Sequence, residues 1–143
     1  MGIFEWVKSQ TGAWGPALLD LYFQNAGWIN AVVVAYGLLL LLSWQNLSRV
    51  IDALADQILE QAREIKVNRK EGSKPVIVHL DDFQLSWERA FTFSKFPFVA
   101  KGSGFFIQRS SLENVRAMIS ERDLAQRCSR QLDQMGLRLE WSK

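Results

Sequence analysis

The sequence predicts a single transmembrane α-helix that continues into an amphipathic helical stalk and then into a small α+β domain, with a mostly antiparallel sheet and one long or two short helices. Three observations predict this fold class. The run from Trp28 to Trp44 carries no charged side chain. Apolar residues keep a helical repeat beyond this run as far as Ile65. From Pro75 onward, short extended runs alternate with turn residues before helical spacing returns.

Charge divides the chain into two parts. Up to Trp44 the only charged side chains are Glu5, Lys8 and Asp20, whereas positions 45–143 hold 16 Lys and Arg and 13 Asp and Glu. A chain of 143 residues is long enough for one compact domain and one membrane segment. The predicted boundaries are 1–26 for an apolar external or interfacial segment, 27–45 for the transmembrane helix, 46–66 for the stalk, 67–74 for a polar linker and 75–143 for the α+β domain.

The uncharged run is typical of a membrane span. As a helix its residues cover about 25 Å, slightly less than the hydrocarbon core, and neighbouring apolar residues extend it. Trp28 and Trp44 bracket the run and are predicted to anchor it at the two membrane interfaces. A helix that is apolar on every side is unusual in the core of a small soluble domain, so we favour the membrane.

The distribution of basic residues predicts the orientation. Lys8 is the only Lys or Arg before the run, and six follow it before Pro75: Arg49, Arg63, Lys66, Arg69, Lys70 and Lys74. Segments rich in Lys and Arg tend to remain on the cytoplasmic side of a membrane. We therefore expect a protein that crosses the cell (inner) membrane once, with the N-terminus outside and the C-terminal domain in the cytoplasm.

Small residues recur within the predicted span. Gly27, Ala31 and Ala35 are four apart, and Gly37 is close by. Such spacing lets a second helix approach closely, and Asn30 is placed to form a hydrogen bond across such a contact. These residues predict packing against other integral membrane subunits.

The stalk carries an apolar seam, defined as Leu47, Ile51, Leu54, Ile58 and Ile65. Ile and Leu at alternating three- and four-residue steps are typical of a two-stranded coiled coil. The seam has fewer than three clean heptads and few specifying charge pairs at its flanks. Three alternatives stay open: the seam packs on a partner or on the protein's own domain, it forms a homo-oligomer, or it lies on the lipid surface.

The pattern of the C-terminal domain predicts several short elements. Residues 75–80 are typical of a buried strand, and for 82–93 we prefer a strand to a helix opened by Asp81 or Asp82. Residues 96–100 and 104–109 flank a Lys-Gly-Ser turn and predict a hairpin.

Helical spacing follows the hairpin. Ser110 and Glu113 are expected to form a capping box for helical sequence that ends near Gly136. Residues 120–123 leave two alternatives open, one long helix or two short ones. Leu137, Leu139 and Trp141 predict a last strand.

No residue pattern indicates catalysis. His79 lies near Asp81 and Asp82, but one His without a second nitrogen or sulfur ligand makes a weak metal site, and the aspartates suit a turn or cap. Cys128 is the only cysteine, so the chain cannot form an internal disulfide. We expect no cofactor and no metal.

Four arginines are candidates for a basic patch: Arg109, Arg116, Arg127 and Arg130. Such a patch suits anionic headgroups or an acidic partner, or is simply a solvated face; nucleic acid is a less suitable partner.

The sequence favours a non-catalytic accessory or structural subunit of a larger membrane complex of respiratory, photosynthetic, transport or secretion type. A self-associating scaffold or signalling protein that uses the seam is the alternative. A membrane-tethered enzyme or ligand-binding module ranks below both.

Overall fold

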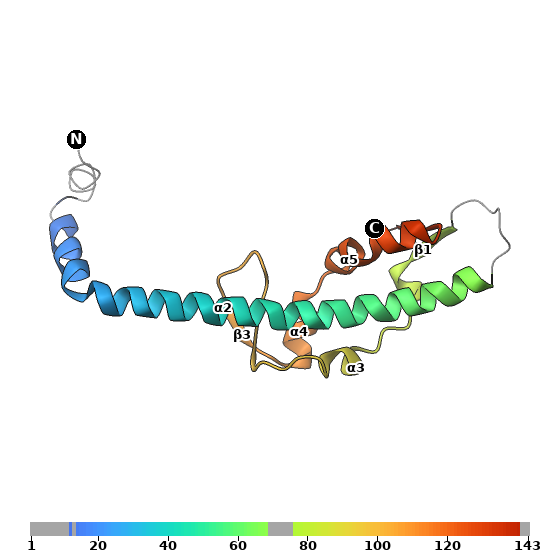
Figure 1. Ribbon diagram of the computed structural model, residues 1–143, viewed down its shortest axis with the longest axis horizontal. Helices are drawn as coiled ribbons and strands as arrows, with labels where there is room; N and C mark the ends of the chain where they lie inside the picture. The colour runs from blue at the N-terminus through green and yellow to red at the C-terminus, as the bar shows by residue number, and fades with distance from the viewer. Residues whose placement is uncertain (1–11, 13, 69–75, 141–143) are drawn as a thin grey trace. The chain divides into compact units, whose positions relative to one another are not determined.

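The computed structural model describes residue 12 and residues 14–68 and 76–140 (Figure 1). The predicted linker therefore lies mostly outside the described residues, as do residues 1–11 of the external segment and Trp141. The chain divides into two compact units, with the division after Leu39. Each unit is described by itself.

One helix, α2 (Trp14–Val67), contributes to both units. Its most apolar stretch has a mean hydropathy of 1.9 and is almost entirely exposed. It is the one helix in the described part of the chain that is long and apolar enough to cross a membrane. The predicted transmembrane helix and stalk are thus parts of one continuous helix, which has no cap or break at the predicted boundary at residue 46.

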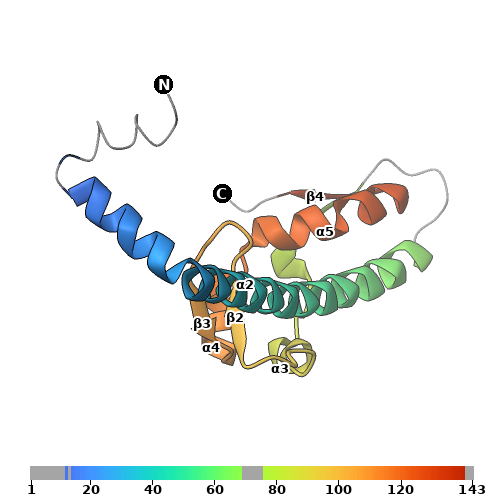
Figure 2. The same ribbon diagram turned by 60° about the vertical axis from the view of Figure 1, so that its left-hand side comes forward.

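The second unit adds three α-helices, one 3-10 turn and four strands to α2. In chain order they are β1 (Val76–His79), η1 (Leu80–Asp82), α3 (Trp87–Phe91), β2 (Phe98–Ala100), β3 (Ile107–Arg109), α4 (Leu112–Met118), α5 (Glu121–Gln134) and β4 (Leu137–Glu140). The predicted α+β composition is confirmed. Figure 2 shows β2, β3 and α4 together near one part of α2, and α5 with β4 near another.

The expectation of a mostly antiparallel sheet is wrong. β1 pairs with β4 in parallel, with Val78 opposite Leu139, and β2 pairs with β3 in antiparallel orientation. The two pairs are separate sheets. β1 is also less buried than its apolar sequence predicts: Val78 is buried, whereas Ile77 is 51% exposed.

The preference for a strand over residues 82–93 is also wrong, because α3 occupies the second half of this segment. Ser86 caps α3, and its hydroxyl accepts a hydrogen bond from the Arg89 amide at 3.4 Å. Phe83 is buried in the stretch before the helix, and Ala90 is the buried residue within the helix.

The hairpin is confirmed, and of the two alternatives for the following helix the structure shows two helices. β2 and β3 pair on either side of the predicted turn, with Ala100 opposite Ile107. The helix divides at Ile119 and Ser120 into α4 and α5. The predicted cap is displaced by one residue, because the Ser111 hydroxyl accepts from Asn114 N at 3.2 Å.

The core of the second unit is built on α2. Its buried α2 residues follow helical spacing: Leu47, Val50, Leu54, Ala55, Ile58, Leu59 and Ala62. They join one cluster with Val99, Val115, Leu124, Leu132 and Leu137 from the later elements. The predicted stalk and the predicted domain therefore form one compact unit.

Two glutamines on α2 hold an extended stretch of the chain. Gln57 accepts from Ser86 N at 2.8 Å and donates to Ser86 O at 3.2 Å. Gln61 makes the same pair of bonds with Gln84, each at 2.9 Å. Each amide thus satisfies backbone groups that have no strand partner.

Candidate functional site

The candidate site is formed where the uncharged run of α2 ends and the hairpin segment, defined as residues 94–109, packs on it. Asn46 lies at the centre of this contact and is 1% exposed. Its Nδ2 donates to Ser94 Oγ at 2.9 Å and to the carbonyls of Phe96 and Phe98 at 2.8 and 3.0 Å. Its Oδ1 accepts from the amides of Lys95 and Phe96 at 2.9 and 3.1 Å.

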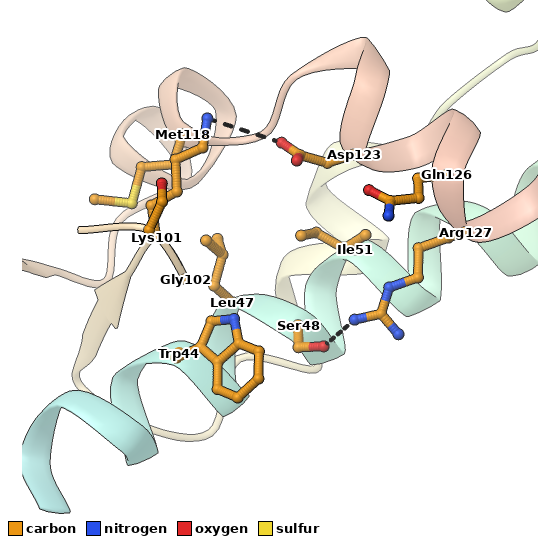
Figure 3. Close-up of a pocket in the computed structure, with 11 residues that line it drawn as sticks. Trp44, Leu47, Ser48, Ile51, Lys101, Gly102, Met118, Asp123, Gln126 and Arg127 are labelled. Carbon is orange, nitrogen blue, oxygen red and sulfur yellow. Dashed lines mark hydrogen bonds and ion pairs between the residues drawn. The ribbon is translucent and has the colours of Figure 1, made fainter.

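A second contact joins the turn of the hairpin to Trp44. A Cβ built on Gly102 would lie 2.6 Å from Nε1 of Trp44, closer than real Cβ atoms come to any neighbour. Glycine at this position thus lets the turn lie directly against the indole (Figure 3). Trp44 keeps 49% of its surface exposed. The hairpin turn is therefore fixed beside the last residue of the uncharged run.

A cavity of about 530 Å³ lies between α2, the hairpin turn and α5 (Figure 3). Its charged groups already have partners: Lys101 Nζ lies 4.0 Å from Asp123, and Arg127 Nη1 lies 3.0 Å from Asp52. Arg127 Nη2 also donates to Ser48 Oγ at 2.6 Å. Arg127 thus joins α5 to α2, whereas Lys101 lies at the distance limit of an ion pair between the hairpin turn and α5. The lining residues are Trp44, Leu47, Ser48, Ile51, Lys101, Gly102, Ser103, Met118, Asp123, Gln126 and Arg127.

The outer surface of the hairpin segment is aromatic and basic. Phe105 and Phe106 are 76% and 84% exposed. Lys95, Lys101 and Arg109 are exposed, and the sequence has no carboxylate between Glu88 and Glu113. The surface next to Trp44 thus combines apolar side chains with positive charge.

The residues predicted to pack in the membrane are exposed. They are Gly27, Asn30, Ala31, Ala35 and Gly37. A Cβ added at Gly27 or Gly37 would meet nothing within 4 Å, and Asn30 accepts a hydrogen bond from the Tyr22 hydroxyl at 3.2 Å. Trp28, the outer predicted anchor, is 79% exposed.

The fold buries only part of the apolar seam. Leu47, Leu54 and Ile58 are buried in the core of the second unit, Ile51 is half-buried and Ile65 is 37% exposed. Of the alternatives that the sequence leaves open, packing on the protein's own domain covers these three residues.

The four candidate arginines come from different elements and have different neighbours. Arg116 on α4 lies 5.6 Å from the centre of the Trp87 ring, a cation–π distance. Arg127 on α5 turns toward α2, Arg130 is exposed on α5, and Arg109 ends β3. Arg116 thus lies on a different helix from Arg127 and Arg130.

The aspartates beside His79 stabilise the local fold. The Asp82 carboxylate accepts from the His79 backbone amide at 2.8 Å. Within residues 14–68 and 76–140, no three His, Cys, Asp or Glu side chains are grouped closely enough to bind a metal.

Among the described residues of the second unit, two ionisable side chains have shifted pKa values. Burial raises the pKa of the Cys128 thiol from 9.0 to about 11, and its S–H donates to Leu124 O at 2.7 Å. Hydrogen bonds from the Ser120 side chain and backbone lower the pKa of Asp123, with smaller contributions from Lys101 and Arg122, against an opposing effect of burial. Both side chains have structural roles, Cys128 in the core and Asp123 in the cap of α5.

Sequence reasoning missed Asn46, Gln57, Gln61 and the contact between Gly102 and Trp44. Asn46 could have been noticed, because it lies one turn before Val50 on the stripe that becomes buried. A polar side chain on such a stripe needs hydrogen-bond partners. The identity of those partners required the fold.

Comparisons with known proteins give no family for this chain. No protein-family model, no curated protein and no solved structure matches it. Function is therefore argued from the residues and contacts above.

Proposed function

We propose that the protein is a single-pass membrane protein that acts as a non-catalytic accessory subunit of a larger membrane complex of respiratory, photosynthetic, transport or secretion type. Its apolar helix packs laterally on integral subunits, and its C-terminal domain braces their cytoplasmic face. The orientation, with the N-terminus outside, follows from the basic residues that come after Trp44.

The observation that carries this proposal is that one helix contributes to both parts. α2 exposes its apolar half and buries its later half in the core of the domain, with no break between them. A helix that only anchors a domain can be joined to it by a flexible linker. Here the hydrogen bonds of Asn46 and the burial of Leu47 fix the domain directly at the end of the apolar run. A subunit that braces its partners needs its domain held close to the end of the span.

Lateral packing is supported by the exposed small residues. Gly27, Ala31 and Ala35 recur every four residues, and the described part of the chain leaves them uncovered. In lipid, close packing of backbones is the main attraction between helices, and small side chains allow it. The proposal includes no catalytic step, because Asp82, Asp123 and Arg127 already serve caps and ion pairs.

The test is purification of the full-length protein from its own membranes in mild detergent, followed by native mass spectrometry. We expect it to be recovered with other integral subunits in a fixed ratio. Replacing Gly27 and Ala31 by Leu should release the protein from these subunits while its domain stays folded. Val33→Leu is the matched control, because position 33 lies on the opposite side of the helix.

Two results would contradict the proposal. Recovery of this chain alone, or only as a homo-oligomer, would rule out an accessory role. Release of the protein from membranes by alkaline carbonate would rule out the membrane span itself.

A further inference from the structure

We propose that the turn of the β2–β3 hairpin docks on the bilayer, with Phe105 and Phe106 inserted among anionic phospholipids of the leaflet from which α2 emerges. This inference rests on the proposed membrane span. It adds a second membrane contact, made by a loop that belongs to the domain.

The exposure of the two phenylalanines is the first observation. Among the described residues of the second unit, Phe106 has the most exposed large apolar side chain at 84%, and Phe105 at 76% comes next after Val67, whereas Phe98 is 38% exposed. They are consecutive and lie between the turn at Lys101–Gly104 and β3, where the Gly104 amide donates to Lys101 O at 2.8 Å. Exposed aromatic residues at the tip of a fixed loop are typical of an interaction surface.

The position of the turn identifies the occupant of this surface. The register of the hairpin pairs Ala100 with Ile107, so that the turn is residues 101–106. Gly102 lies directly on Trp44, and Asn46 holds the preceding residues. A tryptophan that ends an uncharged span lies at the membrane interface. The same contact holds the turn that carries Phe105 and Phe106 next to this interface.

Charge supports the choice of an anionic lipid surface. Lys95, Lys101 and Arg109 are exposed on the hairpin segment, and no carboxylate occurs in the sequence between Glu88 and Glu113. Lys101 Nζ is 4.0 Å from Asp123, the limit of an ion pair, and half of its side chain is exposed. Basic residues next to inserted aromatic residues attract the negative headgroups of the cytoplasmic leaflet.

The experiment places an environment-sensitive fluorophore at single positions of the full-length protein in vesicles of phosphatidylcholine and phosphatidylglycerol. Ser103→Cys reports on the turn and keeps both phenylalanines. Leu38→Cys reports on the span and is probed with lipids that carry the spin label on the acyl chain, because it lies about 9 Å from Trp44 along the helix. Glu60→Cys is a control on α2 beyond the hairpin. Unmodified protein, treated in parallel, corrects for labelling of the buried Cys128.

We expect the label at position 103 to shift to the blue and to be quenched by lipids that carry a spin label near the headgroup, severalfold more than the label at position 60. Replacing both Phe105 and Phe106 by Ser should clearly weaken quenching at position 103, because the turn then stays beside Trp44 without being inserted among the lipids. Phe93→Ser is the matched control and should leave it unchanged, because Phe93 is half-exposed and not part of the turn. Vesicles of phosphatidylcholine alone should weaken quenching at position 103 and leave position 38 unaffected.

The outcomes separate this inference from the proposed function. If position 38 is quenched and position 103 is not, the docking loop is overturned and the span is retained. If neither position is quenched, the membrane span fails as well. If position 103 is protected only when other subunits are bound, the surface belongs to a protein partner and the lipid proposal is overturned.

Discussion

At the scale of single residues, three amide side chains on α2 form hydrogen bonds that the apolar pattern of the sequence did not indicate. Asn46, Gln57 and Gln61 pair with backbone groups of the hairpin segment and of the stretch before α3. Asn46 differs from the two glutamines because its side chain is almost fully buried. A buried backbone group that loses its partner is costly, since no water replaces it.

We expect Asn46→Ala to lower the free energy of unfolding by about 3 kcal/mol, because it leaves the amides of Lys95 and Phe96 without their acceptor. Thermal unfolding in mild detergent, followed by far-UV circular dichroism, measures the loss. Asn30→Ala is the control on the same helix and should change little. Equal effects of the two substitutions would show that Asn46 is not a structural clamp.

Cys128 gives a prediction about pH. Its pKa is raised from 9.0 to about 11, so the folded protein keeps the thiol protonated where the unfolded chain ionises it. The unfolded state then binds fewer protons, and stability should fall as pH rises from about 9 to 11. A Cys128→Ala variant should lose this component of the alkaline decline.

The reactivity of the same thiol provides a second measurement. At neutral pH, native protein should react with a maleimide much more slowly than unfolded protein, because Cys128 is both buried and protonated. Rapid labelling of the native protein would show that α5 opens readily from the core.

At the scale of elements, the sequence predicted those features that depend on local chemistry. The hairpin followed from a glycine-containing turn between apolar runs. Residues that favour a cap at 120–123 made a division possible, but the sequence left one long helix open as well. The segment 82–93 was assigned wrongly because strand alternation and a short helix place the same aromatic residues on one side over so few residues. The parallel pairing of β1 with β4 could not be predicted, because it depends on the path of the chain between them.

The N-terminus of α5 depends on a capping box. The Ser120 hydroxyl accepts from Asp123 N at 3.3 Å, and the Asp123 carboxylate accepts from Ser120 N at 2.9 Å. We expect Ser120→Ala to cost about 1 kcal/mol, measured by thermal unfolding. Ser129→Ala, at an exposed position of the same helix, should cost much less.

The lowered pKa of Asp123 determines how this cap responds to acid. Because the folded state favours the carboxylate, its contribution is complete above the ordinary aspartate pKa of 3.8 and is lost as pH falls through the lowered value. Asp123→Asn should remove this part of the acid dependence. An unchanged acid profile would contradict the cap.

At the scale of the whole molecule, α2 is shared between the apolar part and the folded domain. The sequence predicted the long apolar helix and the α+β region, and it left open what would cover the seam. It could not predict that the later elements pack on α2, because an apolar stripe has the same spacing whether a partner, a second copy or the same chain covers it.

We therefore expect the domain to fold only together with α2. A fragment of residues 75–143 should remain unfolded, because Val50, Leu54 and Ile58 supply part of its core. A fragment that begins at Gln45 should fold. Far-UV circular dichroism and the cooperativity of denaturant unfolding distinguish the two, and cooperative unfolding of the shorter fragment would contradict the shared core.

Within the complete chain, Leu54→Ala should cost about 2–5 kcal/mol, whereas Ile65→Ala should cost less than 1 kcal/mol because Ile65 is partly exposed. A coiled coil would make both substitutions costly. Similar losses at the two positions would favour self-association over the observed packing.

The pairing of β1 with β4 also has a consequence for synthesis. Leu137, which is 1% exposed, joins the core from the last strand, beyond the positive-φ Gly136. A polypeptide that ends before Gly136 lacks Leu137 and β4, so β1 loses its paired strand and the core lacks one of its most buried side chains. Such a truncated product should be degraded by proteases faster than the complete chain.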